Sequence, residues 1–430
     1  MNNHWLARRN FLQIGALGTL GLNVADFDRL LASEVQKKKA ETRADAVLFI
    51  NLAGGVSHLD TLDMKPESPV ETQGEFSRIQ SSIAGLHLCE HLPKLARSMN
   101  QFTLLRGIGH SAGAHPQGQS WISTGNRPTP AVVYPAMGSV VMNEYPGDAD
   151  LPCNVAIPKS EWNPGYLGDA YAAFKTNTVP SPGKPYEVRG LSLSNGLTLD
   201  IVNRRQSLLQ KIDRTFRDTP TGSPLIDALD EFGKQAHQMI TSPRAQKAFD
   251  VGLEPASIRN QFTNDDLNQS CLLACRLIEF GTRFVTVTNA GWDTHLENFK
   301  GHRRLLGPLD NALTATLSVL REKGLLDRTL VVAMGEFGRT PTINENAGRD
   351  HYPRVNCALL AGAGAAKGTL IGGTNKIGDA PDDDTRISPD DIAATIYESL
   401  GIDAQKEYFT NTGRPVQLVP EGTVIEGVFA

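Results

Sequence analysis

Short runs of apolar and β-branched residues recur along the chain and alternate with longer amphipathic stretches. The short runs predict buried strands at residues 46–52, 102–107, 283–288, 329–334 and 356–361. The amphipathic stretches predict helices at residues 265–280, 308–323 and 389–400. Such an alternation is typical of a doubly wound, mainly parallel sheet that is sandwiched by helices. The sequence therefore predicts an α/β fold.

Capping signals mark the ends of these helices. Asn264 can cap the helix at 265–280, and Gly281 can end it. Pro308 is the first residue predicted for the next helix. Ser388 precedes a proline and two acidic residues, which is the pattern of a helix N-terminus.

The predicted domain covers residues 46–430. Its middle, about 134–261, combines polar helical stretches with a loop rich in Pro and Gly, and it is interpreted as a partly helical insertion that could determine specificity.

The N-terminus resembles a targeting segment. Arg8 and Arg9 precede Phe11, Leu12 and a mild apolar run that is too short to span a bilayer, which takes about 20 residues. This pattern predicts a twin-arginine export signal at 1–33 and a polar linker at 34–45. The alternative is an amphipathic N-terminal helix. With the signal, we expect the twin-arginine translocase as a partner during export and a periplasmic or extracellular location.

Charge and cysteine content narrow the classes of function. The net charge is −5 and no long basic run occurs, which argues against nucleic acid as a partner. The cysteines number five and form no CxxC pair, so neither a disulfide framework nor a cysteine zinc site is indicated.

Polar residues that suit metal binding follow the predicted strands. In an open α/β sheet, ligands bind beyond the carboxyl ends of the strands, so residues from several loops can meet there. The residues that follow the predicted strands are Ser57, His58, Asp60, Asp63, His110, His115, Asn289, Trp292, Asp293, His295, Glu336, Asp350 and His351. This mixture of imidazole and carboxylate suits one or two divalent ions such as Zn²⁺, Mn²⁺ or Ca²⁺. Asp and His also cap helices or bond to each other, which is the structural alternative.

Arg339 follows Glu336 at the end of the same predicted strand. Its guanidinium could orient a tetrahedral anion in catalysis. It could equally be the structural partner of a carboxylate.

Several motifs resemble a known bacterial family. GGVSHLDTLDMKP, EHLPKLA, GWDTHLENF, GEFGRTP and GRDHYP are similar to the family called domain of unknown function 1501. That family is placed in the alkaline phosphatase-like superfamily of sulfatases and phosphatases. The resemblance implies that fold and a metal-dependent site in which Asp60, His115, Asp293, His295, Glu336 and His351 follow the order of the superfamily's site residues.

The sequence departs from the superfamily pattern at two places. The stretch HPQGQSWISTGNRP resembles the sulfatase motif, but His115 stands where sulfatases carry the modified cysteine. Phe337 follows Glu336 where a second metal ligand is expected. His115 could therefore be a catalytic nucleophile, or a metal ligand with water as the nucleophile, or a remnant of a lost activity.

Two functions follow from these alternatives. The first is an exported, metal-dependent hydrolase of phosphate or sulfate esters, with a small-molecule or polysaccharide substrate. The second is a non-catalytic, metal-stabilised binding protein of the cell envelope with the same fold.

Overall fold

A mixed sheet of eight strands organises the computed structural model, which describes residues 42–429 except 66, 70, 149, 185, 187, 189–237, 239–240 and 383–385. In spatial order the strands are β12 (Thr369–Ile371), β4 (Thr103–Ile108), β11 (Asn356–Ala361), β8 (Thr329–Met334), β1 (Ala46–Ala53), β7 (Phe284–Ala290), β5 (Asn154–Ile157) and β6 (Phe174–Lys175). Neighbouring strands run parallel except around β11, which is antiparallel to both β4 and β8. The predicted mainly parallel α/β sheet is confirmed.

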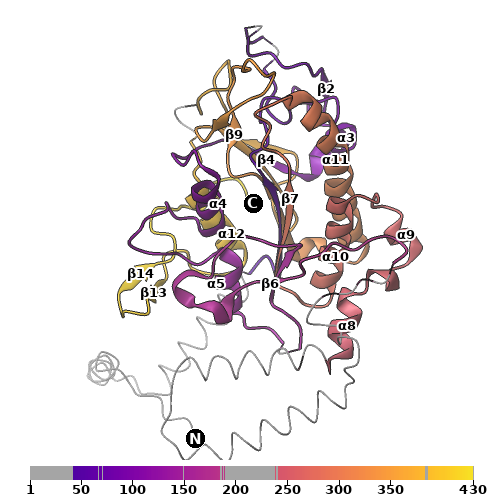
Figure 1. Cartoon of the computed structure of the whole chain (residues 1–430), viewed down its shortest axis with the longest axis vertical. Coiled ribbons are helices and arrows are strands. Elements are labelled where there is room, and N and C mark those ends of the chain that lie inside the picture. Colours follow the sequence, from indigo (N-terminus) through magenta and orange to yellow (C-terminus); the bar gives the residue numbers. More distant parts are fainter. Residues whose placement is uncertain are drawn as a thin grey trace, which may run out of the picture. The chain divides into compact units, whose positions relative to one another are not determined.

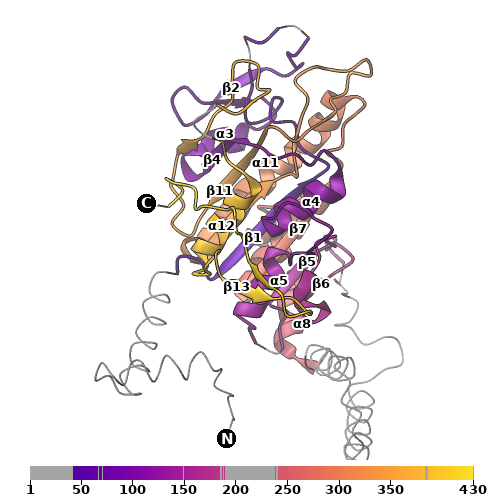
Figure 2. The ribbon, with the colours of Figure 1, turned by 90° about the vertical axis from the view of Figure 1, so that its left-hand side faces the viewer.

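Helices cover both faces of this sheet. One face carries α10 (Asp266–Glu279), α11 (Asn298–Glu322) and the short α3 (Pro93–Ser98). The other face carries α4 (His115–Thr124), α5 (Met137–Glu144) and α12 (Pro389–Ser399). Figure 1 shows the sheet between these two layers, and Figure 2 looks onto the layer of α4, α5 and α12.

The position of β1 at the centre of the sheet explains why its sequence is a continuous apolar run. Leu48 and Ile50 point to the core beneath α10 and α11, whereas Val47 and Phe49 point to the core beneath α5 and α12. All four side chains are fully buried, because helices cover both faces of the strand. A polar residue at any of these positions would lose its hydration.

Three helix boundaries test the capping signals. The side chain of Asp265, rather than Asn264, caps α10 by accepting from the backbone N–H of Asn268. Ser388 caps α12 in a reciprocal capping box with Asp391, as its sequence context predicts. The helix predicted at 308–323 begins ten residues earlier, at Asn298, and Pro308 lies inside it. A proline inside a helix costs about 3 kcal/mol, and Phe299 and Leu306 in the turns before it are buried.

Shorter elements complete the described chain. Two-stranded sheets pair β2 (Arg78–Gln80) with β3 (His87–Cys89), β9 (Gly338–Arg339) with β10 (His351–Tyr352), and β13 (Glu407–Phe409) with β14 (Pro415–Gln417). Two further helices are α8 (Pro243–Phe249) and α9 (Ala256–Arg259). In the antiparallel pair of β9 and β10, His351 lies opposite Arg339. This pairing joins two loops that carry predicted site residues.

The described residues include only part of the domains predicted from the sequence. The export signal predicted at 1–33 and most of the linker at 34–45 lie outside the described residues. Within the stretch predicted as an insertion, about 134–261, β5 and β6 extend the main sheet beside β7. No helix of the described chain is both long and apolar enough to cross a membrane.

Candidate metal centre

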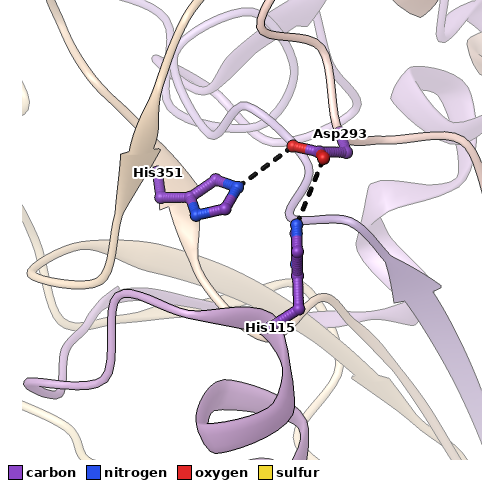
Figure 3. Close-up of side chains that lie close together, drawn as sticks. All are labelled: His115, Asp293 and His351. Carbon is purple, nitrogen blue, oxygen red and sulfur yellow. Dashed lines mark hydrogen bonds and ion pairs between the residues drawn. The ribbon is translucent and has the colours of Figure 1, made fainter.

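Three predicted ligands meet beyond the carboxyl ends of the parallel strands. Asp293 follows β7, His115 is the first residue of α4, and His351 lies in β10. One nitrogen of each ring and one oxygen of the carboxylate all lie within 4.8 Å of one another. Figure 3 shows both imidazole rings turned towards the Asp293 carboxylate from different elements.

A fourth predicted ligand, His295, joins this group. The Nε2 atoms of His115, His295 and His351 lie 3.2, 3.1 and 3.0 Å from carboxylate oxygens of Asp293. The Nε2 atoms of His295 and His351 are 3.0 Å apart. Hereafter, these four residues are called the histidine cluster.

Each imidazole of the histidine cluster has its Nε2 atom towards Asp293 and its Nδ1 atom in a hydrogen bond on the opposite side of the ring. Nδ1 of His115 lies 2.7 Å from Glu336 Oε1, and Nδ1 of His295 lies 2.5 Å from Asp350 Oδ1. Nδ1 of His351 lies 2.8 Å from the backbone carbonyl of Gly113. Carboxylates and carbonyls only accept, so each Nδ1 carries a proton. Each Nε2 faces the Asp293 carboxylate, and it carries a second proton unless a metal ion takes its lone pair.

This arrangement fits a metal ion. Histidine ligands of metals characteristically donate their other N–H to a carboxylate or carbonyl. In addition, two Nε2 lone pairs at 3.0 Å repel each other, so either a proton on one ring or a metal ion must accompany this contact. The donor set of three nitrogens and a carboxylate suits Zn²⁺ and similar borderline metals better than Ca²⁺, which takes oxygen ligands.

The charge of the surroundings favours a divalent cation. Asp293, Glu336 and Asp350 face the three rings. Among the ion pairs of the described residues, Arg339 is the one guanidinium that contacts this group, through Asp293, which leaves a formal charge of −2 when the rings are neutral. Burial alone would raise the pKa of Asp293, but hydrogen bonds from Arg339, His351 and His115 outweigh it and hold the pKa well below its usual range. The hydrogen bond to Glu336 raises the pKa of His115.

The histidine cluster is open to solvent on one side. The side chains of Asp293 and His115 are 43% and 35% exposed. A catalytic metal site keeps a position that a substrate can reach, which for an ion held by all four of these side chains would be a fifth position on the exposed side. The exposure therefore favours a site that meets molecules from solution.

Glu336 and Arg339 form a layer behind the histidine cluster. The carboxylate of Glu336 is 1% exposed and lies between His115 and the backbone N–H of Gly54. Arg339 is fully buried, donates to the carbonyls of Gly54, Gly55, Trp292 and Arg349, and contacts Asp293 Oδ1 at 2.7 Å. Because its guanidinium faces protein groups, its placement fits the structural alternative, a carboxylate partner, rather than an anion clamp.

Asp60 lies in a separate buried ion pair. Its oxygens are 2.8 and 3.0 Å from Nε and Nη2 of Arg349, and Ser57 and Asn298 donate to it as well. Burial alone would raise its pKa, but Arg349 is the main group that holds it below the ordinary value. Among the contacts of the described residues, none joins Asp60 to the histidine cluster, so the structure brings five of the six predicted ligands together and leaves Asp60 apart.

The sequence analysis missed two residues that support the site. Arg349, the partner of Asp60, directly precedes Asp350 and His351, but its partner lies far away in the sequence. Gln119 donates to Glu336 from α4 at 2.8 Å. It stands four residues after His115 and therefore on the same helix face, a spacing that could have revealed it.

Comparisons with known proteins identify a family and similar structures. A family described as "Protein of unknown function (DUF1501)" matches residues 44–429. No curated protein matches the sequence.

Solved structures are similar over most of the chain. The lipoteichoic acid synthase LtaP from Listeria monocytogenes is 11% identical, with a TM-score of 0.40, over 89% of this chain and 76% of that one. The PsFucS1 sulfatase from Pseudoalteromonas sp. is 11% identical, with a TM-score of 0.38, over 89% and 72%. A mutant of TAB5 alkaline phosphatase is 10% identical, with a TM-score of 0.32, over 84% and 99%. At these identities we infer the chemistry of the site from the residues of this chain and not from the similar structures.

Proposed function

This chain belongs to the DUF1501 family, whose function is unknown, and from its site we propose that it is a metal-dependent hydrolase of phosphate or sulfate esters. The observation that carries the proposal is the convergence of three Nε2 atoms on the Asp293 carboxylate, with every Nδ1 held by an acceptor. His115, Asp293, His295 and His351 would hold one divalent ion, with Zn²⁺ as the best match to this donor set.

The bound metal would supply Lewis acidity towards an ester oxygen and lower the pKa of water. The residues of the chain set the conditions for this chemistry. Glu336, Asp350 and the Gly113 carbonyl keep the rings in the tautomer that presents Nε2. Arg339 keeps Asp293 ionised, since its buried guanidinium favours the charged carboxylate.

His115 is better suited to bind than to attack. It stands at the start of α4, at the position that resembles the sulfatase nucleophile, but Nδ1 contacts Glu336 and Nε2 contacts Asp293. Nε2 faces Asp293 beside the Nε2 atoms of His295 and His351, where its lone pair would be shared with their metal and not with a substrate. We therefore assign it to the metal, with water as the nucleophile.

The experiment that tests this proposal measures metal and turnover on the same samples. We expect about one metal ion per chain in protein purified without chelators, and its loss in Asp293→Ala and His351→Ala. His87→Ala, in β3, is the matched control and should retain the metal. Aryl phosphate and aryl sulfate esters should be hydrolysed by the wild type, with Zn²⁺, Mn²⁺ and Ca²⁺ compared, and not by the two cluster variants.

Two results would overturn the proposal in different ways. A wild-type protein that neither contains nor takes up metal would remove its basis. A protein that binds metal through these residues and hydrolyses neither class of ester would favour the non-catalytic, metal-stabilised binding protein. The engagement of both His115 nitrogens is the observation on which that second function would rest.

We also propose export by the twin-arginine route, to the periplasm or beyond, on the residues of the predicted signal at 1–33. Replacement of Arg8 and Arg9 by Lys should leave the protein in the cytoplasm of an expressing bacterium. Unchanged export of that variant would refute the route.

A further inference from the structure

The carboxylate of Glu336 is surrounded by hydrogen-bond donors. The backbone N–H of Gly54 lies 2.9 and 3.1 Å from its two oxygens. Nε2 of Gln119 lies 2.8 Å from Oε2, and Nδ1 of His115 lies 2.7 Å from Oε1. The side chain is almost completely buried. Its two oxygens are thus occupied by protein donors from two segments, the turn after β1 and helix α4.

The orientation of Gln119 is fixed by further contacts. Its Oε1 accepts from Nδ2 of Asn51 at 2.9 Å and from Nε1 of Trp162 at 3.0 Å. An indole N–H can only donate, so the amide oxygen of Gln119 must face Trp162 and its NH₂ group must face Glu336. The NH₂ group of Gln119 and the N–H of Gly54 therefore both require an acceptor at Glu336.

Tight packing keeps this carboxylate in place. A Cβ atom at Gly118 would lie 3.1 Å from Cβ of Glu336, so a side chain at this position of α4 would press on Glu336. Gly54 also connects the two sides of the site, because its N–H binds Glu336 and its carbonyl accepts from Arg339. Glu336 contacts His115 and Arg339 contacts Asp293, so both of these site residues are held through the turn at Gly54.

From these contacts we infer that Glu336 is a positioning residue, which holds His115 with Nε2 towards the metal and does not itself bind the metal. The inference rests on the proposed metal site and gives Glu336 a role other than the ligand that the sequence predicted. A carboxylate that bound the ion would have to leave Gly54, Gln119 or His115, and the donor that it left would lose its acceptor.

The isosteric variant Glu336→Gln separates the two roles. Its amide has one oxygen, so its NH₂ must face either Gln119 and Gly54, which are donors, or Nδ1 of His115. In the second case Nδ1 must accept, the ring proton moves to Nε2, and Nε2 can no longer bind a metal. The variant keeps the volume of the side chain and changes the tautomer or the placement of a single histidine.

The first measurement is Zn²⁺ affinity by competition with a chromophoric chelator. We expect Glu336→Gln to bind Zn²⁺ roughly 10–100-fold more weakly than the wild type, the usual effect of losing an orienting partner of a metal ligand. Gln119→Ala removes one donor to Glu336 without touching His115, and should weaken binding less. Glu345→Gln makes the same chemical change at an exposed position and is the matched control.

The second measurement distinguishes positioning from general damage. Long-range ¹H–¹⁵N spectra of protein labelled at histidine report which ring nitrogen carries the proton. In the Zn²⁺-loaded wild type, the rings of His115, His295 and His351 should each be protonated at Nδ1. In Glu336→Gln, the His115 signals alone should change, whereas those of His295 and His351 should stay.

The outcomes separate this inference from the proposed function. Unchanged Zn²⁺ affinity in Glu336→Gln overturns the positioning role and leaves the metal site intact. Changes at all three rings overturn it as well, since they would mean that the whole site has lost its structure or its ion. If the wild type binds no Zn²⁺, the proposed function itself fails.

Discussion

The buried ion pair of Arg349 and Asp60 allows a quantitative prediction. In Arg349→Met, Asp60 keeps the donors Ser57 and Asn298 but loses its counterion. Removing one partner of a buried pair costs about 3–5 kcal/mol, because the other charge remains in a region of low dielectric. With an unfolding entropy of about 2.1 cal/mol/K per residue, residues 44–429 give about 0.8 kcal/mol/K, so the melting temperature should fall by about 4–6 °C.

The pH dependence of this loss identifies its cause. In the wild type, the lowered pKa of Asp60 contributes stability that is present above its unfolded value of about 3.9 and is lost as pH falls through the folded value. Without Arg349, burial raises the pKa instead, and Asp60 then resists ionisation. The free-energy penalty of Arg349→Met should therefore be largest at neutral pH and shrink as pH falls towards 4.

Urea unfolding at pH 7 and pH 5 measures this penalty. The double variant Asp60→Asn/Arg349→Met buries no charge and should be more stable than Arg349→Met at pH 7, by about 1.4 kcal/mol for each unit by which the pKa of Asp60 would otherwise rise. An equal penalty at both pH values, or a double variant no more stable than the single one, would refute the reasoning.

Three further predictions concern the site and its supports. Gly54→Ala should weaken Zn²⁺ binding and lower the stability of the fold, because its Cβ would lie 2.4 Å from the backbone nitrogen of Asp293. Gly85→Ala is the control, since Gly85 also has a positive φ but nothing within 4 Å of its Cβ position, and equal effects of the two substitutions would exclude the clash as the cause. Zn²⁺ affinity should fall as the pH drops through the raised pKa of His115, because the protonated ring cannot bind a metal. Zn²⁺ affinities measured at constant ionic strength that show no fall between pH 8 and pH 5 would contradict this. Ser388→Ala should cost about 1 kcal/mol in urea unfolding, as expected for the loss of a helix cap, and no measurable loss would mean that the capping box does not stabilise α12.

Local patterns in the sequence were sufficient to predict most of the sheet. β8 and β11 begin and end at the predicted residues, because uninterrupted apolar runs bounded by turns leave little choice of position. The direction of β11 was not predictable in this way. A strand buried on both faces has the same composition whether it runs parallel or antiparallel to its neighbours, and only its pairing with β4 and β8 shows its direction.

The candidate site was predictable as a group of residues and less so in their roles. Five predicted ligands gather because strand ends in a doubly wound sheet share one edge. Whether a carboxylate faces an ion or the back of a histidine depends on contacts between distant segments. Glu336 meets Gly54, and Asp60 meets Arg349, at separations of 282 and 289 residues, which no local pattern encodes.

The place of β1 at the centre of the sheet has a consequence for biosynthesis. Its two neighbours, β7 and β8, come from residues 284–290 and 329–334, so the strand that is synthesised first has no partner until most of the chain has left the ribosome. Pairings this distant in sequence fold slowly, since loop closure precedes any gain in contacts. A nascent chain that ends before residue 329 exposes β1 with one edge unpaired and prone to aggregation, and it should depend on chaperones until synthesis is complete.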